Sequence, residues 1–150
     1  MKLAKLKWET EMVPDPKTNK ALAKMLALLN DITSRKLPEE VKKQINAEIE
    51  WLNTVEIRKL KKGLCKSHGQ IIKVLCEKVK MVPISYYKTL WMSLGMAIFG
   101  VPMGVAFSAA LNNYAFIGIG LPIGMVMGMA VGQKKDEEAK KNGLQLNVNV

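Results

Sequence analysis

One stretch of this sequence carries no charge over the length that two membrane-spanning helices need. From Thr89 to Gln133 there is no Asp, Glu, Lys, Arg or His, although the whole chain has 23 basic and 13 acidic residues. The 88 residues before this stretch are too few and too charged to enclose it in a soluble fold. We therefore expect an all-α integral membrane protein.

The uncharged stretch, residues 89–133, divides into two spans. Thr89–Leu111 contains 23 residues, which as a helix measure about 34 Å against a hydrocarbon layer of about 30 Å. Ala115–Gly132 contains 18 residues, which is near the lower limit for a span. The intervening Asn112-Asn113-Tyr114 favours a reversal of the chain. The sequence thus predicts an antiparallel two-helix transmembrane hairpin.

Lysines flank this hairpin, whereas its turn has no charge. Cytoplasmic flanks carry an excess of Lys and Arg, so both termini are expected in the cytoplasm of a multi-pass protein. Membrane lipids are the expected partners of these side chains. The lysines assigned to lipid headgroups are Lys78, Lys80, Lys88, Lys134 and Lys135.

Small residues recur at intervals of four in both spans. This small-xxx-small pattern is typical of membrane helices that pack with their backbones close together. The second span has Gly120, Gly124, Gly128 and Gly132, and the first has Gly100, Gly104 and Ser108.

The two spans also share the pattern Gly-x-Pro-x-Gly, around Pro102 and Pro122. Proline removes one helical hydrogen bond and tends to kink the helix, so a kink is predicted at each position. The kinks either mark a hinge or pore-lining break, or only shape the packed pair.

The glycine ladder, the short turn and the Lys-rich tail at residues 134–143 resemble the small bacterial glycine-zipper proteins with two transmembrane helices. The resemblance covers residues 93–146. It implies helix association within a membrane, through a homo-oligomer or another membrane protein. The bacterial inner membrane is the location expected from it.

Residues 1–88 are expected to form a basic cytosolic helical segment, with 19 basic and 10 acidic residues. Asp15-Pro16 predicts an N-cap and a helix to about Ser34. Pro38 followed by two acidic residues predicts a second helix to about Lys62. A third helix is expected between Gly63 and Pro83, no strand is expected, and residues 134–150 read as a charged cytosolic tail.

Few residues in the sequence are candidates for catalysis or metal binding. Cys65, His68 and Cys76 have a spacing that would place three zinc ligands on one helix face. No fourth ligand is evident, and a structural role for buried thiols and a lone histidine is the competing interpretation. We expect no enzyme activity and no cofactor. The basic charge is explained by the adjoining membrane spans, so nucleic acid is not an expected partner.

Three functions remain open from the sequence. The first is a membrane-anchored helical interaction or adaptor protein that associates through its glycine-rich helices. The second is a small oligomeric pore or membrane-perturbing protein. The third is a metal-binding or enzymatic protein that uses Cys65, His68 and Cys76.

Overall fold

The chain is mostly helical and forms two compact units. The computed structural model describes residues 3–9, 13 and 15–149. The bundle unit holds the described residues up to Pro83 together with Leu146–Val148, and the hairpin unit holds Ile84–Gln145. The chain therefore leaves the bundle unit, forms the hairpin unit and returns.

The bundle unit begins with helix α1, Pro16–Thr33. Asp15 is its N-cap, and its carboxylate accepts hydrogen bonds from the backbone N–H groups of Lys17 and Thr18 at 3.4 and 3.1 Å. The hydroxyl of Thr18 donates to the same carboxylate. Proline stands at the first helical position, where its missing N–H costs nothing. The predicted start of this helix is confirmed.

Helix α2 spans Glu39–Thr54 and is shorter than predicted. Its expected end at about Lys62 is wrong, because Val55 is extended, with ψ 134°. Thr54 and Val55 are β-branched and poor helix formers. After the break come a short 3-10 helix, η2 (Ile57–Lys59), and helix α3 (Leu60–Val79). The third helix thus begins before Gly63, not after it.

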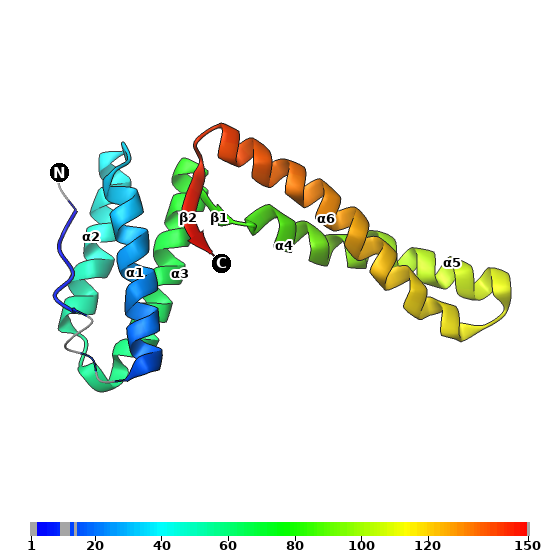
Figure 1. Cartoon of the computed structure of the whole chain (residues 1–150), viewed down its shortest axis with the longest axis horizontal. Coiled ribbons are helices and arrows are strands. Elements are labelled where there is room, and N and C mark those ends of the chain that lie inside the picture. Colours follow the sequence, from blue (N-terminus) through cyan, green and yellow to red (C-terminus); the bar gives the residue numbers. More distant parts are fainter. Residues whose placement is uncertain (1–2, 10–12, 14, 150) are drawn as a thin grey trace. The chain divides into compact units, whose positions relative to one another are not determined.

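Helices α1, α2 and α3 lie side by side in the bundle unit (Figure 1). Each places apolar side chains at helical spacing on its inner face, where they exclude water from one shared core. The largest fully buried side chains of these helices are Leu22, Met25, Leu28, Ile32, Ile45, Ile49, Leu52, Leu60, Leu64, Ile71 and Leu75.

An extended N-terminal segment, residues 3–9, is tied to α2 by two asparagines. Asn46 accepts a hydrogen bond from Ala4 N at 2.8 Å, and Asn53 accepts one from Lys7 N at 2.8 Å. Asn46 and Asn53 are two helical turns apart, so they face the same way. The Trp8 indole N–H also donates to the carbonyl of Leu52.

A two-stranded sheet was not expected from the sequence. Strand β1, Val82–Ile84, pairs with strand β2, Gln145–Asn149. The residues predicted as a charged tail, 134–150, continue as helix to Lys141 and then form β2. Leu146 is fully buried and Val148 is nearly so, which makes these two side chains of β2 part of the bundle core.

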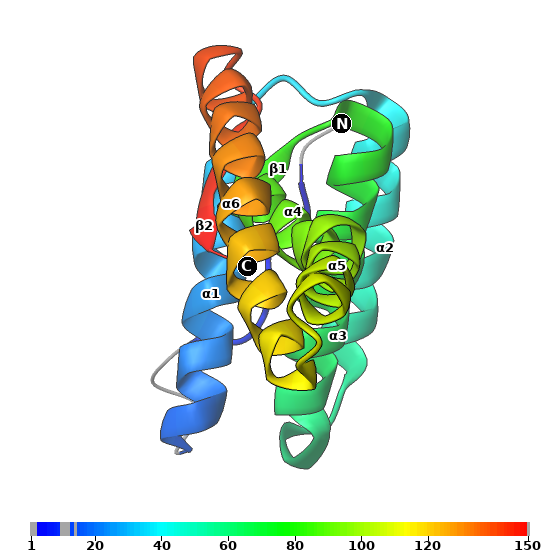
Figure 2. The same ribbon diagram turned by 90° about the vertical axis from the view of Figure 1, so that its right-hand side faces the viewer.

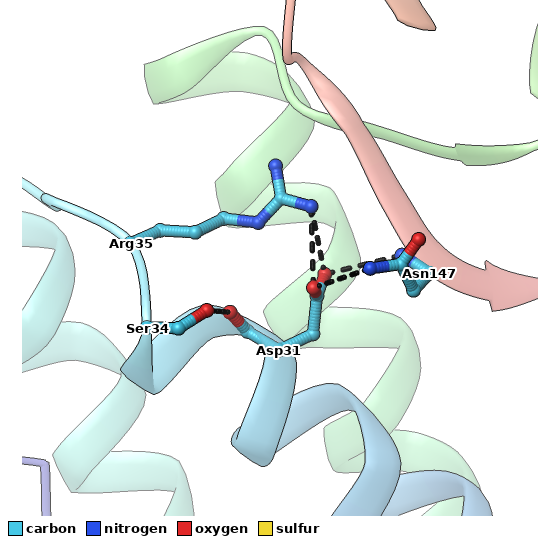
Figure 3. Close-up of polar contacts among 4 residues, drawn as sticks. All are labelled: Asp31, Ser34, Arg35 and Asn147. Atoms are coloured by element: carbon cyan, nitrogen blue, oxygen red, sulfur yellow. Dashed lines mark hydrogen bonds and ion pairs between the residues drawn. The ribbon is translucent and has the colours of Figure 1, made fainter.

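Polar contacts hold β2 to the end of α1 (Figure 3). The Asp31 carboxylate accepts from the backbone N–H of Asn147 at 3.1 Å and from its side-chain amide at 3.0 Å. Arg35 pairs with the same carboxylate at 3.1 Å. Hydrogen bonds to an ionised acceptor are stronger than neutral ones, so this cluster fixes β2 along α1.

The hairpin unit consists of two long helices joined by a tight turn. The first contains α4 (Tyr86–Gly95), the π-helical turn η3 (Met96–Gly100) and α5 (Val101–Leu111) without interruption. The second contains the 3-10 turn η4 (Tyr114–Phe116) and α6 (Ile117–Lys141). Figure 2 shows α6 running beside α4 and α5. Both helices are long and apolar enough to cross a membrane.

The turn of the hairpin is made by two asparagines, in agreement with the sequence. Asn112 adopts the left-handed conformation, φ 50°, and ends α5. The side chain of Asn113 accepts a hydrogen bond from Ala115 N at 2.9 Å and so caps the next helix. Asparagine suits both roles, because its short side chain bonds to nearby backbone and tolerates positive φ.

Candidate functional site

The glycines of the two spans face one another inside the hairpin. A Cβ atom added to Gly124 would lie 2.5 Å from Gly100 N and 2.5 Å from Gly95 O, and one added to Gly132 would lie 2.5 Å from Lys88 Cα. Real Cβ atoms do not approach backbone this closely, so only glycine fits at these positions. The glycines predicted to pack are all buried: Gly100, Gly104, Gly120, Gly124, Gly128 and Gly132.

Gly95 belongs to the same interface, although the sequence analysis missed it. A Cβ at Gly95 would collide with the backbone of Gly124 and Gly128. Gly95 precedes Gly100 by five residues and so falls outside the four-residue register. The π-helical turn η3 corrects this spacing, because Val101 N bonds to Met96 O, five residues back. One extra residue per turn keeps Gly95 and Gly100 on one face.

The two prolines occupy different local settings. Pro102 is the second residue of α5, separated from η3 by Val101, whereas Pro122 lies inside α6. Proline has no N–H to complete the i→i−4 pattern, so the helix is already irregular at Pro102, next to the π turn. The sequence predicted equivalent kinks at both prolines. The structure shows a π turn beside Pro102 and an uninterrupted α-helix through Pro122.

Ser108 continues the small-residue face of the first span and is buried. Its carbonyl accepts from the backbone N–H groups of Asn112 and Asn113 at the end of α5. Ser108 thus lies where the two helices meet near the turn.

The large apolar side chains of the hairpin point outward. Ile98 is 55% exposed and Val126 is 61% exposed, whereas Leu64 in the bundle core is fully buried. The arrangement is the reverse of a soluble core, with glycine inside and bulky residues outside. The exposed large apolar residues of the two long helices are Leu90, Leu94, Ile98, Phe99, Val101, Val105, Phe107, Leu111, Tyr114, Ile117, Ile119, Leu121, Val126, Met127 and Val131.

Asp136 joins the polar ends of the two hairpin helices. Its carboxylate accepts from Tyr87 N and Lys88 N, both at 3.0 Å, at the start of α4. The first N–H groups of a helix have no partner within the helix, and they favour negative charge. Lys135, one residue earlier, places its ammonium 5.9 Å from the centre of the Trp91 ring. The sequence analysis missed this cap, because it joins residues 48 and 49 positions apart.

The five lysines assigned to lipid headgroups belong to both units. Lys78 and Lys80 end α3 in the bundle unit, where Lys78 pairs with Glu40 at 3.1 Å. The others lie in the hairpin unit, where Lys134 and Lys135 are exposed and Lys88 is half-buried. Their contact with lipid stays a prediction.

Cys65, His68 and Cys76 all lie on α3 but do not form a three-ligand site. In the part of the chain that the structure describes, no three His, Cys, Asp or Glu side chains are grouped closely enough to hold a metal ion. Cys65 is exposed and Cys76 is half-buried. Burial, aided by neighbouring Glu77, raises the pKa of the Cys76 thiol, which disfavours the reactive thiolate.

Comparison with known proteins found no matching family model, no matching curated protein and no matching solved structure.

Proposed function

We propose that this chain is a membrane-anchored helical interaction protein. Its hairpin spans a bilayer, both termini lie on the cytosolic side, and its bundle unit is displayed to a partner there. The bacterial inner membrane is the proposed location.

The exposed apolar surface of the hairpin carries this proposal. Soluble monomers rarely expose a contiguous apolar patch larger than a few hundred Å². Here bulky apolar residues cover the outside of both long helices, from Leu90 to Val131. Lipid tails are a natural cover for such a surface, and the backbone polar groups are satisfied within the helices, as a bilayer requires.

The contrast between the two units supports the adaptor role. The bundle unit buries its apolar residues and carries most of the charged residues of the chain. It therefore suits an aqueous compartment and contact with a soluble partner. A membrane anchor joined to a water-exposed interaction domain is expected to combine one unit with an apolar surface and one with a charged surface.

The packing of the glycines within one hairpin argues against the alternative of an oligomeric pore. A pore of several hairpins would need contacts between hairpins, whereas the glycine faces already meet within one hairpin. Any self-association would then use the outward apolar face. We therefore favour the anchored interaction protein over the pore.

The topology is tested by cysteine labelling from either side of the membrane. Asn113→Cys, in a chain that also carries Cys65→Ser and Cys76→Ser, places one thiol in the hairpin turn. We expect a membrane-impermeant maleimide to label it in intact bacterial spheroplasts, and not from the cytosolic face of inverted vesicles.

The native Cys65 supplies a matched control. It is exposed on α3, so a Cys76→Ser chain with Asn113 retained should be labelled only from the cytosolic side. Labelling of both thiols from the same side would reject the spanning hairpin.

A further inference from the structure

A pocket of about 480 Å³ opens on the bundle unit where α2 ends and α3 begins. Its volume is within the range of sites that hold small molecules, about 300–1,000 Å³. Trp51, Thr54 and Val55 from the end of α2 form one side, and the first turns of α3 form the other. We refer to it as the basic pocket, for the lysines described below.

An indole ring forms the apolar side of the basic pocket. Trp51 is 44% exposed, although many other large side chains of the same unit are fully buried. Gly63 brings the backbone of α3 close to it, since a Cβ there would lie 3.7 Å from Trp51 Cζ3 and 3.3 Å from Leu52 Cδ2. An exposed indole beside a glycine leaves an open apolar surface against which a ligand can pack.

Three lysines also line the basic pocket. Lys59, Lys62 and Lys66 follow one another at intervals of three and four, so they share one side of the chain as it enters and follows α3. Lys66 Nζ lies 5.3 Å from the centre of the Trp51 ring. Glu56 is the single acidic residue of the lining.

Some lysines of the bundle unit are paired with an acidic side chain. Lys42, Lys73 and Lys78 each form an ion pair with a glutamate. Among the described residues, no carboxylate forms an ion pair with Lys59, Lys62 or Lys66. Three exposed ammonium groups around one pocket, with a single acid beside them, give a local excess of positive charge that attracts an anion.

We propose that the basic pocket binds a phosphate group attached to an apolar or aromatic moiety. The ammonium groups of Lys59, Lys62 and Lys66 donate hydrogen bonds to the phosphate oxygens, as lysines do in other phosphate sites. The apolar moiety packs against Trp51 and Val55. The phosphate comes either from a soluble phosphomonoester or from the headgroup of an anionic lipid. The assignment does not depend on the membrane topology proposed above.

The test uses the full-length protein in phosphatidylcholine nanodiscs and isothermal titration calorimetry. Phenyl phosphate is the soluble probe, and dihexanoyl phosphatidic acid, kept below its micellar concentration, is the lipid probe. The variant carries Lys59→Gln, Lys62→Gln and Lys66→Gln. Its control carries Lys17→Gln, Lys20→Gln and Lys24→Gln, which remove the same charge with the same spacing from exposed positions on α1.

We expect saturable binding of at least one probe by the native protein. The pocket variant should bind it about tenfold or more weakly, because a hydrogen bond to a charged group is lost with each lysine. The control variant should stay within about twofold of the native affinity. Tighter binding of phenyl phosphate would identify a soluble ligand, and tighter binding of the phosphatidic acid would identify a headgroup.

A further variant separates the two halves of the ligand. Trp51→Leu should weaken binding of phenyl phosphate relative to inorganic phosphate, because only the former has a ring to pack on the indole. Helical content by circular dichroism verifies that each variant is folded. Absence of saturable binding of both probes, or an equal loss of affinity in the pocket and control variants, would overturn the proposal.

Discussion

His68 shows how a single side chain can make the stability of the bundle unit depend on pH. It lies on α3 and is half-buried, and its buried Nε2 has no hydrogen-bond partner among the described residues. Burial lowers the pKa of His68 below its usual 6.5, and the positive charge of Lys24 lowers it further. The folded state therefore binds a proton at His68 less readily than the unfolded chain does.

The sign of the pH effect follows from this lowered pKa. Above about pH 7 both states hold His68 neutral, and stability does not depend on it. As the pH falls below the unfolded pKa of 6.5, the unfolded chain takes up a proton first and the bundle unit is destabilised. The loss is complete once the pH is below the pKa of the folded state. We expect hydrogen exchange of α1 and α3 amides in the full chain to quicken between about pH 7 and pH 5, after correction for the intrinsic pH dependence of exchange.

His68→Gln supplies the comparison, because glutamine does not titrate. The corrected acceleration should shrink in this variant. An equal acceleration in the native chain and the variant would assign the effect to other groups. Hydrogen bonds from Thr18 and Lys42 lower the pKa values of Asp15 and Glu39 from their ordinary 3.8 and 4.5, which already lie below this window.

At the scale of the element, the two hairpin helices depend on glycine at the positions where they touch. We expect Gly124→Ala to destabilise the hairpin by about 2–3 kcal/mol, because the methyl group would overlap the backbone of the first helix. Gly118→Ala is the matched control, since nothing lies within 4 Å of a Cβ there. Unfolding by sodium dodecyl sulfate, followed by circular dichroism, measures both. Equal effects of the two substitutions would show that the glycine contact is not formed in the folded protein.

The cap on α4 makes a separate prediction. Asp136→Ala removes the acceptor of two backbone N–H groups, and caps of this kind contribute about 1 kcal/mol. We expect the amides of Tyr87 and Lys88 to exchange faster in the variant. Glu137→Ala, an exposed neighbour on the same helix, should leave them unchanged. Unaltered protection of both amides in Asp136→Ala would mean that water replaces the cap without cost.

The sequence predicts the hairpin unit well. Its long uncharged stretch predicts two long apolar helices, and its pair of asparagines predicts the turn between them. The first begins at Tyr86 rather than Thr89, because the aromatic residues before the stretch are helical too, and the second continues to Lys141 because charge does not end a helix. Asp15 and Pro16 likewise predict the start of α1 from local chemistry alone.

The elements that were missed have no clear signal in the sequence. No Gly or Pro marks the end of α2 at Thr54, so the apolar periodicity led us to predict a helix that was too long. Strand β1 has three residues, too few for an alternating pattern. Strand β2 does alternate, with Leu146 and Val148 buried and Asn147 exposed, and this was the available signal. Gly95 joins the interface only through a π turn, which no regular period predicts.

At the scale of the whole molecule, the bundle unit is discontinuous in sequence. Leu146 is fully buried in it, so Leu146→Ala should lower the free energy of unfolding of the bundle unit by about 2–4 kcal/mol. Leu26→Ala, at a position on α1 that is 36% exposed, should cost less. Urea unfolding of the full chain in detergent, followed by hydrogen exchange of α1 to α3, tests both. An equal cost would mean that β2 adds nothing to the core.

The place of β2 also sets an order of events during translation. Ribosomes produce the chain from its N-terminus, and domains generally fold as their residues emerge. Helices α1 to α3 appear first, yet the Asp31 carboxylate lacks its two Asn147 donors, and the apolar surface beneath β2 stays uncovered, until Leu146–Val148 follow. The hairpin is synthesised in between. The bundle unit is therefore completed only after the ribosome has made the whole hairpin, so the nascent chain forms the hairpin before it can close the bundle.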